Sequence, residues 1–141
     1  MNEIQVKYNR NYEQESIKVS SSKDVDRYIR EVYDNIDYVE KVYIVLLNRA
    51  NIIIGHKLIS QGSSSATVVD VKGIFQIALL THADNIVLVH NHPSGNLNPS
   101  GQDETITTKI KKAGELMDIK LLDHLIITSE SYYSFMDNNN L

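Results

Sequence analysis

The chain has no cysteine at any position. It can therefore form no disulfide, supply no thiolate ligand to a zinc ion and use no cysteine nucleophile, and this fits a reducing compartment. The N-terminal residues lack the apolar stretch of a signal peptide, and no apolar run approaches the roughly 20 residues that a membrane span needs. We therefore expect a cytoplasmic protein without a membrane segment.

An excess of basic residues is missing as well. Lysine and arginine number 14 against 18 aspartate and glutamate residues, and the formal net charge is −4. Nucleic-acid-binding domains usually show a basic excess or a basic stripe. The densest basic cluster, "KIKK" at 109–112, fits the solvated face of a helix. Direct nucleic-acid binding is therefore not expected.

The length and composition are those of a single globular domain. The chain has 141 residues, of which 42% are apolar and 23% charged, so it can bury a stable core without disulfides or other cross-links. Neither an internal repeat nor a linker is visible. We expect one domain over residues 1–141.

Hydrophobic periodicity predicts a chain that alternates between strands and helices. Short β-branched apolar runs indicate buried strands, and apolar residues at helical spacing indicate amphipathic helices. This order favours an α/β (α+β) fold, in which helices flank one mixed sheet. A polar connection is expected over 61–70 and a frayed tail over 136–141. The predicted strands cover 3–8, 42–47, 52–60, 85–92 and 119–130, and the predicted helices about 23–35, 71–83 and 100–117.

The stretch "HNHPSGNLNPSGQD", residues 90–103, carries the most specific signal. His90 and His92 end a strand, and the period of two along a strand directs both imidazoles to the same face. Asp103 follows a turn-rich loop and falls in the first turn of the next helix. Two histidines and one carboxylate suit a catalytic zinc ion, which usually keeps one open position beside three protein ligands.

Structural explanations exist for the same residues. A His-x-His pair alone is weak evidence for a metal. Ser100 has the position of a helix N-cap, and Asp103 three residues later fits a capping box. Capping and catalysis do not exclude each other, because a helix start holds both side chains in place. The full combination of strand, His-x-His-Pro, glycine-containing loop, serine and aspartate favours the metal site.

The spacing His90-x-His92, seven residues, Ser100, two residues, Asp103 resembles the JAMM motif. That motif defines metal-dependent proteases and isopeptidases of the JAB/MPN class, which share a cytidine-deaminase-like fold. Together with "LLDHLII" at 121–127, the stretch resembles the bacterial RadC-like branch of the class more closely still. The similarity covers roughly residues 17–135. A nucleobase deaminase in its usual form needs cysteine ligands, which this chain lacks.

The resemblance assigns roles to individual residues. His90, His92 and Asp103 would bind one Zn²⁺ per chain. The motif also requires an upstream glutamate at the start of a strand, and Glu40 in "YVEKVYIVLL" matches by position. Glu40 would take a proton from the zinc-activated water and pass it to the leaving amine. Ser100 would support the oxyanion.

Further polar residues near the motif are given other roles. Asn91 lies between the two histidines and, on an ideal strand, points away from them, so a supporting role is expected. Asp123 and His124 match the RadC-like pattern, and a buried polar brace is favoured over direct catalysis. The residues expected to be solvated or incidental are Glu31, Glu104, Glu115, His56 and His82.

The sequence thus predicts a zinc-dependent hydrolase of peptide or isopeptide bonds, a JAMM-type metallopeptidase with an unknown peptide or protein substrate. The alternative is a zinc-binding interaction module with a link to DNA repair or mobile elements. Full-length RadC proteins carry a helix-hairpin-helix region, for which the 39 residues before Glu40 leave no room, so DNA binding is not transferred. The compact chain also has little length for the loops that hold ubiquitin in eukaryotic relatives. The oligomeric state is left open.

Overall fold

The computed structural model describes residues 1–5, 15–62 and 69–141. Three helices and five strands alternate along this part of the chain. Their bounds are α1 Ser22–Arg30, β1 Glu40–Leu47, β2 Ile53–Gly62, α2 Val71–Leu80, β3 Asn85–Asn91, α3 Gly101–Met117, β4 Lys120–Ile127 and β5 Tyr132–Ser134.

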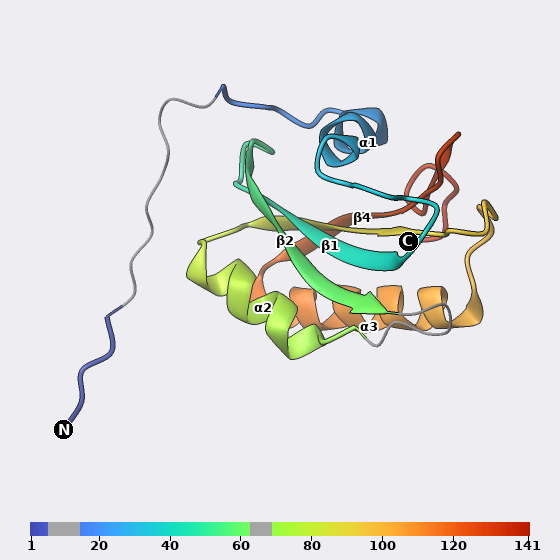
Figure 1. Cartoon of the computed structure of the whole chain (residues 1–141). Helices are drawn as coiled ribbons and strands as arrows, with labels where there is room; N and C mark the ends of the chain where they lie inside the picture. The colour runs from blue at the N-terminus through green and yellow to red at the C-terminus, as the bar shows by residue number, and fades with distance from the viewer. Residues whose placement is uncertain (6–14, 63–68) are drawn as a thin grey trace.

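The five strands form one mixed sheet in the order β2-β1-β3-β4-β5. The β1–β2, β1–β3 and β4–β5 pairs are antiparallel, whereas β3 and β4 are parallel and are joined through α3. Figure 1 shows α1 on one side of the sheet and α2 and α3 on the other. The predicted α+β fold with helices on a mixed sheet is therefore confirmed, and it is consistent with a JAB fold.

Strand alternation divides the apolar residues of the sheet between two cores. In β1, Val42, Ile44 and Leu46 pack toward α2 and α3, while Tyr43, Val45 and Leu47 pack toward α1. β3 continues this division: Ile86 and Leu88 belong to the first core, and Val87 and Val89 to the second. Residues 90 and 91 at the end of β3 consequently fall on opposite faces, His90 on the α3 side and Asn91 on the α1 side.

The helix α3 begins with the motif that the sequence predicted. Ser100 is its N-cap, and the side chains of Ser100 and Asp103 form a reciprocal capping box with the backbone. The helix ends at a left-handed residue, Asp118. A Cβ on Gly114 would collide with the Ile119 carbonyl oxygen, so glycine permits the tight return of the chain into β4.

The hairpin and the strand predicted over 85–92 match the structure closely, whereas the helix predicted over 71–83 ends at Leu80 and the strand predicted over 119–130 ends at Ile127. The first helix is shorter than the predicted 23–35, because it ends at Arg30. The Glu31 and Val32 amides donate to carbonyls three residues back, which tightens the last turn and closes the helix. The residues up to Asn35 belong to the connection that leads into β1.

Two predictions fall partly outside the described residues. Of the strand predicted over 3–8, residues 6–8 are not described, and residues 3–5 lie in no strand. An isolated bridge between Lys18 and Ile52 instead brings the segment before α1 against the sheet. Of the polar connection predicted over 61–70, Gln61 and Gly62 still belong to β2, and 63–68 lie outside the described residues.

The prediction of a frayed tail over 136–141 was wrong, and β5 was missed. Turns held by backbone hydrogen bonds, from Asn138 to Ser134 and from Asn140 to Phe135, fold the tail back. Leu141 packs against the first core as a partly buried residue. The polar composition of "MDNNNL" does not reveal this ordered tail, because backbone hydrogen bonds and one apolar side chain hold it in place.

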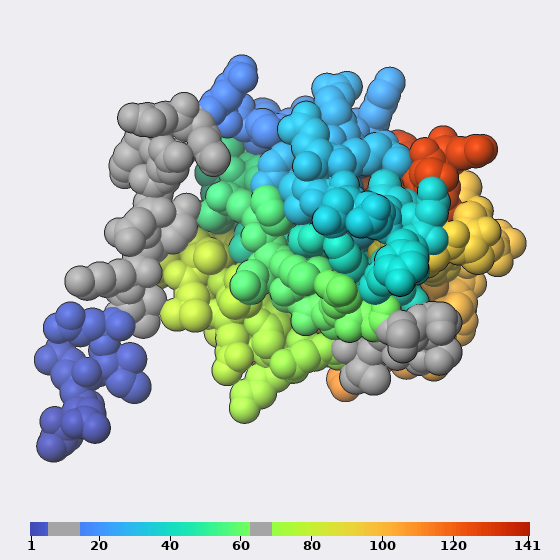
Figure 2. All heavy atoms as spheres, in the orientation of Figure 1, coloured from blue at the N-terminus to red at the C-terminus, as the bar shows by residue number. Residues whose placement is uncertain are grey.

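The outer strand β2 lies on the face shown in Figure 2, between α1 and α2. Its register with β1 shifts at two places, between Val42 and Tyr43 and between Leu46 and Leu47. Such irregularities twist an edge strand and reduce its tendency to pair with other chains. Within the described residues, none of the helices has the length and apolar character required to cross a bilayer.

Candidate metal centre

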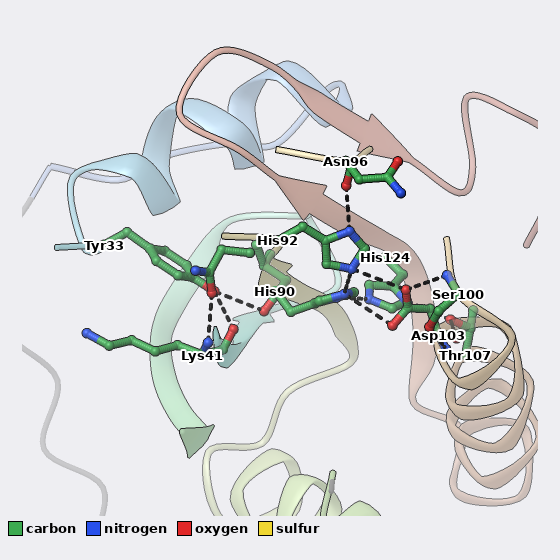
Figure 3. Close-up of polar contacts among 11 residues, drawn as sticks. Tyr33, Lys41, His90, His92, Asn96, Ser100, Asp103, Thr107 and His124 are labelled. Atoms are coloured by element: carbon green, nitrogen blue, oxygen red, sulfur yellow. Dashed lines mark hydrogen bonds and ion pairs between the residues drawn. The ribbon is translucent and has the colours of Figure 1, made fainter. Parts of the chain in front are cut away.

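The candidate site lies where three segments of the chain meet at one end of the sheet. His90 and His92 come from the end of β3, Asp103 from the first turn of α3 and Glu40 from the start of β1. Figure 3 shows both imidazoles directed toward the Asp103 carboxylate. The structure therefore gathers all the ligand candidates of the sequence analysis, together with the proposed acid/base, around one place.

The distances between the three ligand candidates suit one metal ion. His90 Nε2 lies 3.2 Å from Asp103 Oδ1, His92 Nε2 lies 3.3 Å from Asp103 Oδ2, and the two Nε2 atoms are 2.9 Å apart. In a tetrahedral zinc site with bonds of about 2.0–2.1 Å, neighbouring ligand atoms are about 3.3 Å apart. His90 and His92 each face a different oxygen of the same carboxylate, and this set of two imidazoles and one carboxylate suits Zn²⁺ in its chemistry.

His92 is oriented by the loop that follows β3. Its Nδ1 lies 2.6 Å from the Asn96 carbonyl oxygen, which can only accept a hydrogen bond. Nδ1 therefore carries a hydrogen, and Nε2 is the nitrogen that faces Asp103 and His90. Metal-binding histidines in proteins commonly use such a bond to fix the tautomer and the ring orientation.

His90 is supported from within the core. Its Nδ1 lies 2.7 Å from His124 Nε2, and His124 Nδ1 lies 2.6 Å from the Thr107 hydroxyl on α3. The parallel register pairs His124 with Leu88, and a shift at the start of the β3–β4 ladder brings His124 onto the α3 side of the sheet. Burial strongly lowers the pKa of His124, so this imidazole is neutral.

The ionisable groups at the site interact strongly in the metal-free protein. Partial burial opposes ionisation of Asp103, but hydrogen bonds from His90 and His92 outweigh it and hold the pKa of this carboxyl well below its usual range. The hydrogen bond with Asp103 raises the pKa of His92. A metal ion bound here would therefore compete with a proton for the same nitrogen of His92.

Glu40 lies beside the two histidines but outside the Asp103 contacts. One carboxylate oxygen of Glu40 and one ring nitrogen each of His90 and His92 lie within 4.8 Å of one another. Glu40 is partly exposed at the first position of β1. This carboxylate can therefore exchange protons with a molecule bound between the histidines and solvent.

Asn91 holds the segment that carries Glu40. Its side chain is fully buried on the α1 side, where Nδ2 donates to the Ile36 and Val39 carbonyls at 2.7 and 2.8 Å. Its Oδ1 accepts from the Lys41 amide at 2.7 Å. The bonds on Val39 and Lys41 flank Glu40 on both sides, so the expected supporting role of Asn91 takes the form of a backbone clamp.

Ser100 has the capping geometry that its position predicted. Its Oγ accepts from the Asp103 amide at 3.1 Å, and its own amide donates to Asp103 Oδ2 at 2.7 Å. The cap uses a lone pair of the hydroxyl and leaves the hydroxyl hydrogen available to donate. Figure 3 shows Ser100 next to Asp103 at the start of α3.

Asp123 braces the sheet on the side away from His90 and His92. Its Oδ2 accepts from the Ser134 hydroxyl, and its Oδ1 accepts from the His124 and Met136 amides. Burial raises the pKa of Asp123. These bonds tie β5 and the following turn to β4, as expected for a structural brace.

The other polar residues lie away from the site or at its surface. Glu31, Glu104 and Glu115 are exposed, in agreement with a solvated position. The exposed His56 bonds the Tyr28 hydroxyl at 2.7 Å, and His82 is an exposed residue in the turn after α2. Sequence reasoning missed Thr107 and the Asn96 carbonyl. Of these two, only Thr107 could have been suspected from the sequence, because it lies one helical turn after Asp103.

Comparisons with known proteins identify the family. The family model described as RadC-like JAB domain matches residues 19–141. A UPF0758 protein of Flavobacterium johnsoniae is 44% identical over 120 residues, 85% of this chain and 52% of the relative. A UPF0758 protein of Chlorobium chlorochromatii is 40% identical over 102 residues, 72% of this chain and 46% of the relative.

A third relative, the UPF0758 protein of Thermotoga maritima, is 32% identical over 126 residues, 88% of this chain and 55% of that protein. The chain spans about half the length of the curated relatives it matches. The family match covers the whole sheet, all three helices and every residue of the candidate site. The chain belongs to the RadC-like JAB domain family.

Proposed function

We propose that this protein is a zinc-dependent hydrolase of peptide or isopeptide bonds. The observation that carries the proposal is the convergence of His90, His92 and Asp103, with Glu40 beside them. His92 already directs Nε2 toward Asp103, while its Nδ1 is held by the Asn96 carbonyl. A metal-dependent hydrolase is plausible for the family, and this donor set is one that catalytic zinc ions use.

A bound zinc ion supplies Lewis acidity, which brings the pKa of a water molecule to about 7. Glu40 would accept a proton from that water and deliver it to the leaving amine. The Ser100 hydroxyl, whose hydrogen the cap does not use, would donate to the developing oxyanion. The Asn91 clamp would keep Glu40 in place through both proton transfers.

One observation favours a second function. The Glu40 carboxylate lies close enough to both histidines to be a fourth ligand. Zinc sites closed by four protein ligands are structural. In that case the protein would be a zinc-stabilised interaction module.

The experiment compares wild type with Glu40→Gln in metal content and in hydrolysis of a peptide and isopeptide library. We expect the variant to keep its zinc ion and to lose about 10²–10⁴-fold in turnover, the range of general acid–base catalysis. Glu104→Gln, an exposed residue on α3, is the control and should behave as wild type. Loss of zinc in Glu40→Gln would favour the closed site, and unchanged turnover would refute the role of Glu40.

The substrate and the cellular location belong to the same proposal. The net charge of −4 favours a protein or peptide substrate over a nucleic acid. The absence of cysteine from the chain suits zinc chemistry without thiolates in a reducing cytoplasm.

A further inference from the structure

The buried His124 has no assigned part in the proposed reaction, although it contacts a metal ligand. It is 0% exposed and lies between two partners, His90 Nδ1 at 2.7 Å and Thr107 Oγ1 at 2.6 Å. Its ring stacks on Phe135 with the centroids 4.5 Å apart and the planes 6° from parallel. The stacked ring and the two hydrogen bonds leave this imidazole a single orientation.

The hydrogen positions in this chain follow from the last acceptor. The Thr107 hydroxyl lies 2.6 Å from the Asp103 carbonyl oxygen, which can only accept, so the hydroxyl donates to it. Thr107 Oγ1 has then used its hydrogen, and it accepts from His124 Nδ1–H. In the neutral His124, Nε2 therefore carries the lone pair and accepts from His90 Nδ1–H.

The hydrogen bond between His90 Nδ1 and His124 Nε2 determines which nitrogen of His90 can bind a metal. With a hydrogen on Nδ1, His90 has Nε2 as the nitrogen that can offer a lone pair to a metal, and this atom lies 2.9 Å from His92 Nε2 and 3.2 Å from Asp103 Oδ1. If His124 were rotated or replaced by an apolar residue, His90 could take the other tautomer and direct an N–H at the metal position. Such a tautomer cannot bind a metal through that atom.

We infer that His124 and Thr107 are positioning residues that commit His90 to bind zinc through Nε2. This inference deepens the proposed function and rests on it for the identity of the metal. His124 gives His90 a neutral acceptor, so it orients the ligand without adding negative charge. Asp103 supplies the terminal carbonyl of the chain of bonds and also a ligand oxygen, which couples the two histidines to the start of α3.

A packing role alone makes a different prediction from a positioning role. If His124 only filled the core beneath Phe135, an apolar residue of similar size would serve equally well. If it orders the hydrogen on His90, a side chain with an acceptor and a donor must stand in its place. Glutamine offers both groups in one amide, whereas leucine offers neither.

The test measures zinc affinity by competition with a chelating dye, on folded full chains checked by circular dichroism. We expect His124→Leu to bind zinc ~10–100-fold more weakly than wild type, the usual cost of removing such a partner. His124→Gln should recover most of that loss. Ile110→Val, which loosens the same core without touching the network, is the control and should bind zinc as wild type does.

A second pair of variants keeps the test decisive if His124→Leu fails to fold. Thr107→Val removes the hydroxyl at nearly constant shape and should weaken zinc binding, while Thr107→Ser should not. Long-range proton–nitrogen NMR spectra of the histidine rings should place the His90 hydrogen on Nδ1 in wild type. A mixture of His90 tautomers is expected in Thr107→Val.

The outcomes separate this inference from the proposed function. Wild-type zinc affinity in both His124→Leu and Thr107→Val would overturn the positioning role, even if the enzyme proved active. Wild type that binds no zinc would instead overturn the metal centre itself, and both proposals with it. Weakened binding in these variants, together with full turnover in Glu40→Gln, would support the positioning role and refute the hydrolytic mechanism.

Discussion

On the α3 side of β3, His90 contacts other side chains, and nearly every partner can gain or lose a proton. On the α1 side, the neighbouring Asn91 bonds only backbone groups, two carbonyls and one amide. Two neighbouring residues of the strand therefore have different surroundings: His90 belongs to a network of ionisable side chains, and Asn91 holds backbone groups in place. The difference indicates that the candidate metal ligands and the proposed acid/base are held by independent means.

Removal of both histidines should have the largest effect on the α3 side of the sheet. In His90→Ala/His92→Ala we expect zinc content to fall from about one ion per chain to none, because one carboxylate alone binds zinc weakly. Elemental analysis of dialysed protein measures this, with folding checked by circular dichroism. The pair His56→Ala/His82→Ala removes two exposed histidines and should leave the zinc content unchanged. Retention of zinc in the first variant would place the metal elsewhere.

Substitutions of Ser100 test whether the α3 side of the sheet has a catalytic role in addition to metal binding. Glycine is tolerated at an N-cap at a cost of only a few tenths of a kcal/mol, but it has no hydroxyl. We therefore expect Ser100→Gly to lose about 10²–10³-fold in kcat with nearly unchanged stability, as when one oxyanion donor is removed. Ser100→Thr keeps both functions and should retain activity. Equal activity in the glycine variant would reduce Ser100 to a cap.

A substitution of Asn91 tests whether its backbone hydrogen bonds hold the segment around Glu40 on the opposite face of the sheet. In Asn91→Leu the Lys41 amide and two carbonyls lose their partner, and we expect the free energy of unfolding to fall by about 1–3 kcal/mol. Urea denaturation of the metal-free protein measures this, and zinc affinity should stay within about threefold of wild type because the ligands face the other side. Asn85→Leu, at the partly buried start of the same strand, should cost less. A large loss of zinc affinity in Asn91→Leu would mean that the two faces are coupled.

The smallest expected effect is a pH dependence that arises on the α3 side alone. In the metal-free protein the pKa of His92 is raised above its ordinary 6.5, so its contribution to stability is complete below pH 6.5 and is lost as pH rises through the raised value. The pKa of Asp103 is lowered from 3.8, so its contribution is present above that pH and is lost as pH falls. The pair therefore stabilises the metal-free protein between about pH 4 and pH 6.5.

Zinc needs a deprotonated His92, so protons oppose it in that same window. The increase in Tm on adding zinc should accordingly be larger at pH 8 than at pH 5.5, by several degrees. Thermal melts at both pH values measure it. The destabilisation by Asn91→Leu should be the same at both, because its partners do not titrate. A zinc effect independent of pH would exclude His92 as a ligand.

Much of this site could be predicted from the sequence, because its signals are local. Strand alternation placed His90 and His92 on one face, and helix-capping chemistry placed Ser100 and Asp103 at the start of α3. The same alternation directed Asn91 to the other face. The first helix was predicted too long and the tail was predicted to fray, because in both places backbone hydrogen bonds and single packed side chains decide the ends.

The sequence by itself determined which residues have metal-binding chemistry and at which strand and helix ends they lie. Periodicity and capping act over a few residues, so they can be seen without a structure. The motif resemblance pointed to Glu40, but only the tertiary structure decided how closely it adjoins the histidines, that Asn91 clamps it, and that a shift in the β3–β4 register brings His124 beneath His90. Those contacts join residues more than 30 positions apart, and their geometry depends on strand order and register, which no local pattern encodes.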